Sequence, residues 1–162
     1  MREYQTLTME FDPVCDARSR ILILGSFPSQ KSREAHFSYG HPRNRFWQVI
    51  ARLTGEDVPV STEEKKALLL SHGIALWDVI ERCDIIGSSD SSIRNVIPAR
   101  IPELLDRTGI RKVFANGGAA SRLYDRYILP QAGIPAVRLP STSPANARMD
   151  LEALVSAWKV IL

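Results

Sequence analysis

The stretch ILILG, residues 21–25, is a short continuous apolar run closed by glycine. Such a run is typical of a strand that is buried on both faces of a parallel sheet. Similar runs are GIALWDVI (73–80), KVFAN (112–116) and AVRLP (136–140). The stretches between them predict helices over 45–54, from Ser61 to the terminating Gly73, and over 100–108, 118–128 and 149–161. Helical segments of this length between strands predict an α/β fold, a three-layer α/β/α sandwich around a four-stranded, mainly parallel sheet.

Length and composition restrict the class of protein. The 162 residues suit one domain, 1–162, and 44% hydrophobic with 24% charged residues indicate a globular chain. No apolar run approaches the roughly 20 residues of a membrane span, and MREYQTLTMEF lacks the apolar core of a signal peptide, so we expect a cytoplasmic protein without a membrane partner. Two cysteines and three scattered histidines predict no metal and no cofactor. The net charge of +3 permits a nucleic-acid partner without requiring one.

Polar segments follow all four predicted strands. They are GSFPS (25–29), WD (77–78), NGG (116–118) and LPSTSPAN (139–146). Each segment alone is compatible with a turn, and the two glycines of NGG are explained by the opening of a helix against the sheet. Because ligands of parallel sheets bind beyond the carboxyl ends of the strands, the four segments together predict one site.

The loop LPSTSPAN combines two prolines with three hydroxyl residues. A stiff loop with outward hydroxyl and amide groups suits contacts with phosphate oxygens. A nucleophilic Ser143 is the alternative, but it needs a histidine base that the sequence does not identify.

The segment YGHPRNRFWQVI, residues 39–50, places unusual polar chemistry at the start of a predicted helix. Asn44 stands one residue before the helical pattern, where an N-cap is expected, and Arg43 and Arg45 would then lie in solvent. An N-cap role for Asn44 does not explain why Tyr39 and His41 stand directly before it. An aromatic ring, a proline-stiffened backbone and an amide beside an open sheet edge suit a flat heterocycle.

Together, GSFPS, YGHPRNRFW, GIALWDV and LPSTSPAN resemble the uracil-DNA glycosylase superfamily, and more narrowly its hypoxanthine-DNA (DNA-deoxyinosine) glycosylase branch. HPRNRFW is also similar to the mismatch-specific uracil and thymine glycosylases. The resemblance runs in order from about Ile21 to Asn146. It implies the sandwich fold and a DNA repair enzyme that flips out a deaminated base, hypoxanthine with uracil as a second substrate. The enzyme would hydrolyse the N-glycosidic bond and leave an abasic site.

Two departures from the superfamily pattern matter. Most members place Asp or Asn third in the loop after the first strand, where it positions the attacking water, whereas this chain has Phe27. In the hypoxanthine branch the amide of HPxN, here Asn44, takes that role. The base-reading Asn of uracil-specific members is matched here by Asp78, which argues against a strict uracil enzyme.

The resemblance assigns roles residue by residue. Asn44 would orient water through its carbonyl oxygen while its amide hydrogens contact the water or the base. His41 would donate to the leaving base or remain a loop histidine bonded to backbone. Tyr39 would stack on the base, Asp78 would accept from its ring N–H, and Phe27 would line the base pocket.

The remaining assignments concern the DNA backbone. The expected DNA contacts are Ser29, Ser32, Ser141, Ser143, Asn146 and Arg148. No lysine stands in the four loop motifs, so a monofunctional glycosylase without a lyase step is expected. Residues 87–95, GSSDSSIRN, are predicted to be a surface loop in which Asp90 and Ser91 border the pocket without an assigned mechanism.

The partner expected is DNA that contains deaminated bases, and the sequence identifies no protein partner. Three alternatives remain open: a uracil or thymine glycosylase acting on guanine mismatches, a non-catalytic nucleotide-binding module, and a small hydrolase that uses Ser143.

Overall fold

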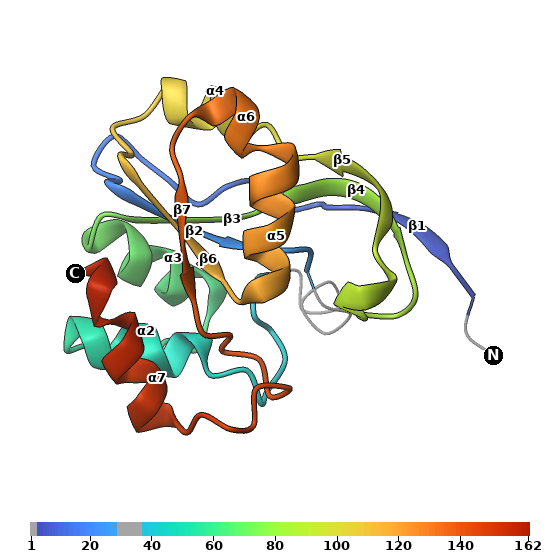
Figure 1. Cartoon of the computed structure of the whole chain (residues 1–162). Coiled ribbons are helices and arrows are strands. Elements are labelled where there is room, and N and C mark those ends of the chain that lie inside the picture. The colour runs from blue at the N-terminus through green and yellow to red at the C-terminus, as the bar shows by residue number, and fades with distance from the viewer. Residues whose placement is uncertain (1–2, 29–36) are drawn as a thin grey trace.

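The computed structural model describes residues 3–28 and 37–162, and its centre is a four-stranded parallel sheet (Figure 1). The strand order is β3-β2-β6-β7. The strands are β2 (Ile21–Gly25), β3 (Ile74–Asp78), β6 (Lys112–Asn116) and β7 (Ala136–Leu139). The predicted sheet is therefore confirmed, with the ILILG strand in its interior.

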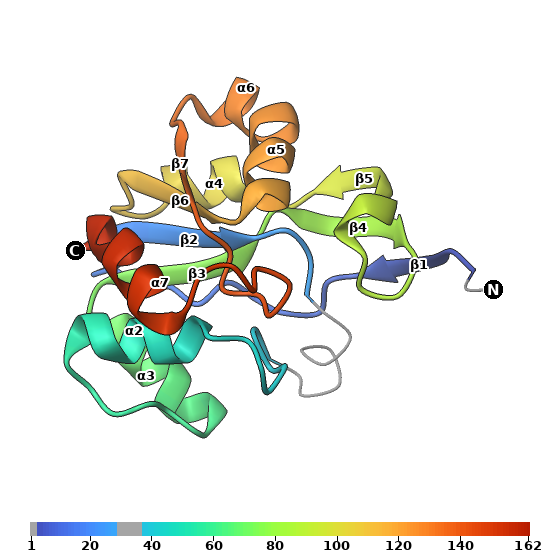
Figure 2. The same ribbon diagram turned by 60° about the horizontal axis from the view of Figure 1, so that its bottom comes forward.

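Helices cover both faces of this sheet (Figures 1 and 2). One face carries α2 (Phe46–Thr54), α3 (Thr62–Ser71) and α7 (Leu151–Trp158), which continues into the 3-10 helix η2 (Lys159–Ile161). The other face carries α4 (Ile101–Asp106), α5 (Gly118–Tyr127) and α6 (Leu129–Ala132). The predicted three-layer sandwich is confirmed, and the predicted helices agree with these bounds to within a few residues.

The central strand explains why its sequence is continuously apolar. Ile23 belongs to the core cluster that contains Phe46 and Trp158, whereas Leu22 and Leu24 belong to the cluster on the opposite face. The three side chains are completely buried. A strand covered on both faces has no position at which a polar side chain would meet water.

A second, antiparallel sheet was not predicted. It consists of β1 (Gln5–Thr8), β4 (Ile80–Ile85) and β5 (Arg94–Pro98), in the order β1-β4-β5. The prediction of one strand over 73–80 was wrong, because β3 ends at Asp78 and the chain enters β4 at Ile80. The predicted loop 87–95 was wrong in part, since it contains the 3-10 helix η1 (Asp90–Ser92) and the first residues of β5.

The missed strands share a weak sequence signal. In β4 charged residues separate the buried residues Ile80, Cys83 and Ile85, and β5 has no fully buried residue. Short amphipathic strands of this kind resemble polar loops when read from sequence alone. None of the helices in the part of the chain that the structure describes is long and apolar enough to cross a membrane.

The ends of β2 and β3 approach very closely. Gly25 pairs with Asp78 in the parallel register. A Cβ atom at Gly25 would lie 2.5 Å from Asp78 Oδ1 and 3.2 Å from the Tyr39 hydroxyl. Only glycine leaves room for both oxygens at this edge of the sheet.

We therefore expect Gly25→Ala to destabilise the protein by roughly 1–3 kcal/mol, because the added methyl overpacks this corner. Urea denaturation measures the effect. In an Asp78→Ala background the cost of Gly25→Ala should fall, since the nearest atom has been removed. Unchanged stability of Gly25→Ala alone would show that the carboxylate does not need this space.

Candidate active site

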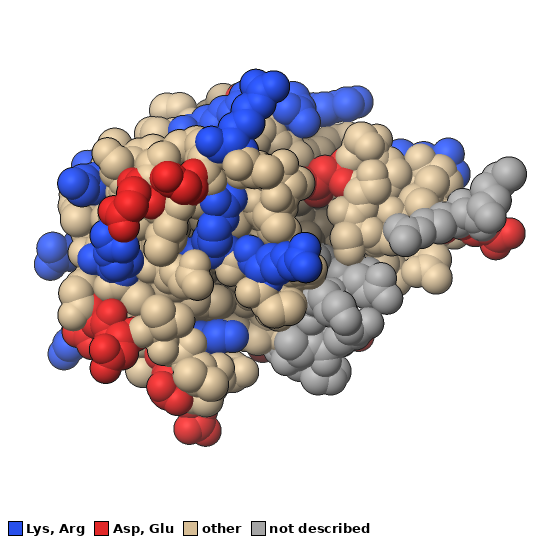
Figure 3. All heavy atoms as spheres, turned by 90° about the horizontal axis from the view of Figure 1, so that it is seen from below, with Lys and Arg blue, Asp and Glu red and all other residues tan. Residues whose placement is uncertain are grey.

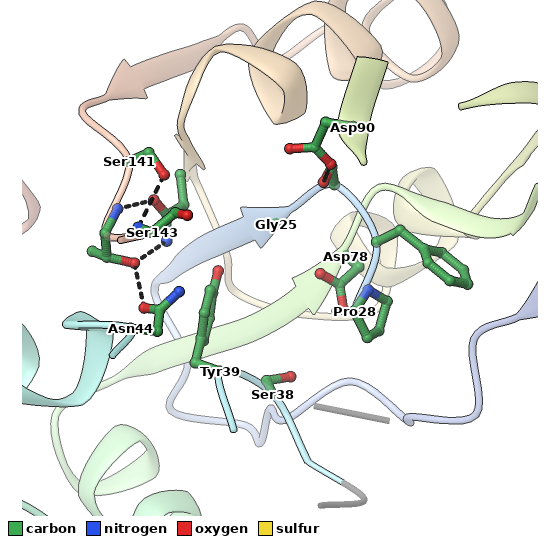
Figure 4. A pocket seen from close by; sticks show the side chains of 13 residues that line it. Gly25, Pro28, Ser38, Tyr39, Asn44, Asp78, Asp90, Ser141 and Ser143 are labelled. Carbon is green, nitrogen blue, oxygen red and sulfur yellow. Dashed lines mark hydrogen bonds between the residues drawn. The ribbon is translucent and has the colours of Figure 1, made fainter. Parts of the chain in front are cut away.

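A pocket of about 130 Å³ lies at the carboxyl ends of the parallel strands (Figure 4). All four predicted loop segments contribute to its wall. The predicted site residues that line it are Phe27, Tyr39, Asn44, Asp78, Ser141 and Ser143. The convergence expected from the strand ends is thus present in the folded chain.

A chain of hydrogen bonds connects three of these loops. The backbone N–H of Thr142 donates to Asn116 Oδ1 at 3.1 Å, and Asn116 Nδ2 donates to Thr142 Oγ1 at 3.0 Å. The Thr142 hydroxyl donates to Asn44 Oδ1 at 2.8 Å. Thr142 itself is completely buried.

The donor-to-acceptor direction of these hydrogen bonds follows from the first donor, the backbone N–H of Thr142. A backbone N–H can only donate, so it makes Asn116 Oδ1 the acceptor and turns Asn116 Nδ2 toward the hydroxyl of Thr142. The hydroxyl proton must then point to Asn44. Asn44 Oδ1 also accepts the Phe46 backbone N–H at 3.0 Å, so both of its lone pairs are used.

Asn44 consequently presents its amide NH₂ to the pocket. Its Nδ2 makes no hydrogen bond to any described residue, whereas its oxygen accepts the first N–H of α2 and the Thr142 hydroxyl. The expected N-cap role of Asn44 was wrong by one residue, because the N-cap of α2 is Arg45. The hypothesis that the carbonyl oxygen of Asn44 orients water disagrees with this geometry. The group available for chemistry is a hydrogen-bond donor.

Tyr39 lies between Asn44 and Asp78 (Figure 4). Its ring stacks on Phe46 with centroids 4.1 Å apart and an interplanar angle of 15°. The backbone at Tyr39 has φ of 56°, a left-handed conformation that costs about 1–3 kcal/mol for such a residue. Its hydroxyl is buried without a hydrogen-bond partner among the described residues. Burial, and next the charge of Asp78, raises the pKa of this hydroxyl, so it remains protonated.

Asp78 forms the floor of the pocket and is 7% exposed. Its carboxylate makes no hydrogen bond to the described residues. Burial, followed by repulsion from Asp90, raises the pKa of Asp78 from 3.8 to about 7. A carboxyl group in this state changes charge near neutral pH and has a free acceptor for a ligand.

Arg45 holds the last loop in place and does not lie free in solvent as expected. Its guanidinium donates to the carbonyls of Ser143 and Asn146, each at 3.0 Å, and to the carbonyl of Met149. Two tryptophans of the core add to this support: Trp47 Nε1 donates to the carbonyl of Ser38, and Trp158 Nε1 to that of Pro140. The loops around the pocket are therefore tied to the helices below them.

The other predicted site residues that the structure describes lie outside the cavity. His41 Nδ1 accepts the Arg43 backbone N–H at 3.0 Å, which is the loop role considered as the alternative for this histidine. Asn146 Nδ2 donates to the Ser141 carbonyl at 3.0 Å, so its side chain braces the loop. Arg148 is exposed. Ser29 and Ser32 lie outside the described residues.

Sequence reasoning missed several residues of the site. Thr142 and Asn116 stand inside segments that were singled out, but nothing in the sequence indicated that they bond to each other. Ser38 and Ser26 line the pocket as well. Asp90 was expected only to border it and carries one of the two carboxylates in its wall.

Charge on the face shown in Figure 3 is mixed, with lysine and arginine side chains scattered among acidic ones. This distribution agrees with the modest net charge of +3. Among the described residues no group of three or more His, Cys, Asp or Glu side chains is arranged to hold a metal ion. The polar side chains that line the pocket carry amide, hydroxyl and carboxyl groups.

Comparison with known proteins defines the class to which this fold and site belong. Residues 12–161 match the model of the uracil DNA glycosylase superfamily, and the chain belongs to that superfamily. A hypoxanthine DNA glycosylase of Methanosarcina barkeri is 34% identical over 149 residues, which cover 91% of this chain and 93% of the relative. A hypoxanthine DNA glycosylase of Methanosarcina acetivorans is 33% identical over 159 residues, which cover 93% of this chain and 95% of that relative.

A solved structure shares the fold. The solution NMR structure of a candidate uracil DNA glycosylase from Methanosarcina acetivorans matches with a TM-score of 0.79 and 30% identity. The match covers 97% of this chain and 99% of that structure. The resemblance inferred from the loop motifs is confirmed.

The Thr142 hydroxyl is expected to orient the Asn44 amide. Thr142→Val keeps the shape but removes the acceptor of Asn116 Nδ2 and leaves Asn44 Oδ1 with the Phe46 N–H as its one donor, at a cost of about 1–3 kcal/mol in stability. Thr142→Ser retains the hydroxyl and should behave like the wild type. Thermal denaturation of both variants tests this, and a loss of stability in Thr142→Ser but not in Thr142→Val would mean that the methyl group, not the hydroxyl, matters.

Asp78→Asn should stabilise the protein, and more so at higher pH. The folded state binds the Asp78 proton more tightly than the unfolded state, so wild-type stability falls as pH rises from about 4 through about 7. Near pH 8 the variant should gain up to roughly 4 kcal/mol, with a smaller gain near pH 5. Urea denaturation at both pH values measures this, with Asp106→Asn on the surface as control. A gain independent of pH would contradict a buried, titrating Asp78.

Proposed function

We propose that this protein is a monofunctional DNA N-glycosylase that releases hypoxanthine from deoxyinosine and leaves an abasic site. The observation that carries the proposal is the pairing, in one small pocket, of a fixed amide donor at Asn44 with a buried and unbonded carboxylate at Asp78. The similarity to two hypoxanthine DNA glycosylases supports the same substrate.

Recognition of the base follows from the groups in the pocket. Hypoxanthine presents a ring N–H beside a carbonyl, and an ionised Asp78 accepts from that N–H. Adenine presents a bare nitrogen at the same place and would face the carboxylate with a second acceptor. Leaving such polar groups unpaired in a buried site discriminates strongly between substrates. The Tyr39 hydroxyl, which has no partner in the free protein, is a donor suited to the neighbouring carbonyl of the base.

Access to this pocket requires a flipped nucleotide. A base inside the duplex cannot reach Asp78, and unstacking costs a few kcal/mol, least for mispaired or damaged bases. Tyr39 already has one ring face covered by Phe46, so the base is left with its other face or edge. We expect Ser141 and Ser143, which line the pocket, and the exposed Arg148 to contact the DNA backbone.

Bond cleavage places negative charge on the departing base. The Asn44 NH₂ has a fixed orientation because the oxygen of the same amide accepts two hydrogen bonds, from the Phe46 N–H and the Thr142 hydroxyl. A preorganised donor of this kind stabilises developing charge without reorganisation. None of the described residues lining the pocket is a lysine, which agrees with hydrolysis rather than a Schiff-base step.

The other candidate functions have less support. Uracil carries the same N–H and carbonyl pair, so it is the natural second substrate, including uracil or thymine opposite guanine. A hydrolase using Ser143 lacks a base, because no histidine stands among the described pocket residues. A binding module would not need the amide of Asn44 to be fixed by two donors.

Asn44→Asp is the sharpest test of the proposal. A carboxylate keeps both acceptor contacts, to Phe46 N–H and Thr142, but removes the amide donor. Base release from a duplex with one deoxyinosine, read as strand scission after alkali, should fall by about 100-fold or more, as for loss of one preorganised donor. The fold should be retained, as checked by circular dichroism.

Duplexes with deoxyuridine or a guanine·thymine mismatch serve as parallel substrates. Release of uracil alone would replace hypoxanthine by uracil in the proposal. Binding of these duplexes without release of any base by the wild type would favour the binding module. Equal rates for Asn44→Asp and wild type would show that base release does not need the amide donor of Asn44.

A further inference from the structure

We infer that Asp90 is a second catalytic residue, which accepts a proton from the water that attacks the sugar. The inference rests on the proposed glycosylase function and adds a residue to which no role has been assigned. Asp90 comes from η1 in the antiparallel sheet region and reaches the pocket from the side opposite Asn44 (Figure 4).

The carboxylate of Asp90 is held at one oxygen only. Ser26 Oγ donates to Asp90 Oδ1 at 2.8 Å, and Ser26 is the residue that follows the Gly25 end of β2. The second oxygen makes no hydrogen bond to any described residue. The side chain is thus fixed in direction and retains a free acceptor, as a general base requires.

The depth of the groups in the pocket assigns them to different parts of the nucleotide. Asp78 is 7% exposed and lies at the floor of the pocket, whereas Asp90 is an exposed residue at its rim. A flipped base enters first while its sugar stays attached to the DNA backbone outside. Asp78 is therefore at the level of the base, and Asp90 is at the level of the sugar and of solvent water.

The other acceptors among the described pocket residues fit this role less well. Both lone pairs of Asn44 Oδ1 are used by Phe46 N–H and Thr142, and Phe27 in the first loop has no polar atom in its side chain. Asn116 Oδ1 accepts the Thr142 backbone N–H. Asp90 is the carboxylate that combines a fixed orientation with contact to water.

The charges around Asp90 are suited to a proton acceptor. Partial burial raises its pKa, whereas the Ser26 hydrogen bond and the charge of Arg122 on α5 act in the opposite direction. Asp78 lies close enough to Asp90 for the repulsion between the two carboxylates to raise the pKa of Asp78. The negative carboxylate also stabilises the positive charge that develops on the sugar as the bond breaks.

The step balances without another reactant. The oxygen of water forms a bond to C1′ of the sugar, and the bond from C1′ to N9 of hypoxanthine breaks with its electron pair going to the base. The water proton passes to the free oxygen of Asp90 and then to solvent. The released base takes up one proton from solvent, so the products are free hypoxanthine and an abasic site.

Asp90→Asn isolates the charge, because asparagine still offers an oxygen to the Ser26 hydroxyl. Single-turnover release of hypoxanthine from the deoxyinosine duplex should be slower by about 100-fold or more, the usual contribution of a general base. Binding to the same duplex carrying a non-hydrolysable 2′-fluoro deoxyinosine should be unchanged or tighter, since a negative charge near phosphates is removed. Added formate should restore part of the rate in Asp90→Ala but not in Asn44→Asp.

Asp106→Asn, a surface change on α4, is the control for net charge and should leave the rate unaltered. Release by Asp90→Asn within about threefold of the wild type would overturn the role of Asp90 and leave the proposed function intact. A loss of rate with a matching loss of DNA binding, and no rescue by formate, would also overturn it. No release by the wild type itself would instead refute the proposed glycosylase.

Discussion

The buried hydroxyl of Thr142 is the contact on which the geometry of the pocket depends. It accepts from Asn116 at the end of β6 and donates to Asn44 before α2, so it connects segments that are 98 residues apart in sequence. Because the Thr142 backbone N–H sets the direction of the whole chain of bonds, the side-chain amide of Asn44 has one orientation. The outcome is a donor aimed into a cavity, fixed by groups that never touch a ligand.

The pocket contains several groups that do not favour folding. Tyr39 has a left-handed backbone and an unpaired buried hydroxyl, and Asp78 has a carboxyl group whose charged form is penalised by burial. Such features persist only where surrounding contacts over-determine them, and they gather at functional sites. Here Arg45 and the indoles of Trp47 and Trp158 supply that support by holding loop carbonyls against the helical layer.

The antiparallel sheet lies outside the central sheet of the sandwich and nevertheless contributes to the pocket. It follows β3 after one residue and carries η1, from which Asp90 reaches the pocket. The two carboxylates of the site thus come from different elements: Asp78 ends β3 of the parallel sheet, and Asp90 lies in η1 between two strands of the antiparallel sheet. In our proposal this separation places one acceptor at the base and another at the sugar, so that recognition and water activation are carried out by different residues.

The sequence by itself determined the parallel sheet and the segments that form the site. Buried strands such as ILILG carry a strong local signal, since every side chain is apolar, and the residues after such strands must meet at one edge. Tyr39, Asn44 and Asp78 were identified in this way with the help of their family resemblance. The antiparallel strands were not, because β4 interrupts its buried residues with charged ones and β5 has no fully buried residue. Only the tertiary structure decided which atom of Asn44 faces the pocket, that Arg45 braces a loop, and that Asp90 joins the site. Each of these depends on hydrogen bonds or charges between residues distant in sequence, and no local pattern encodes such pairings.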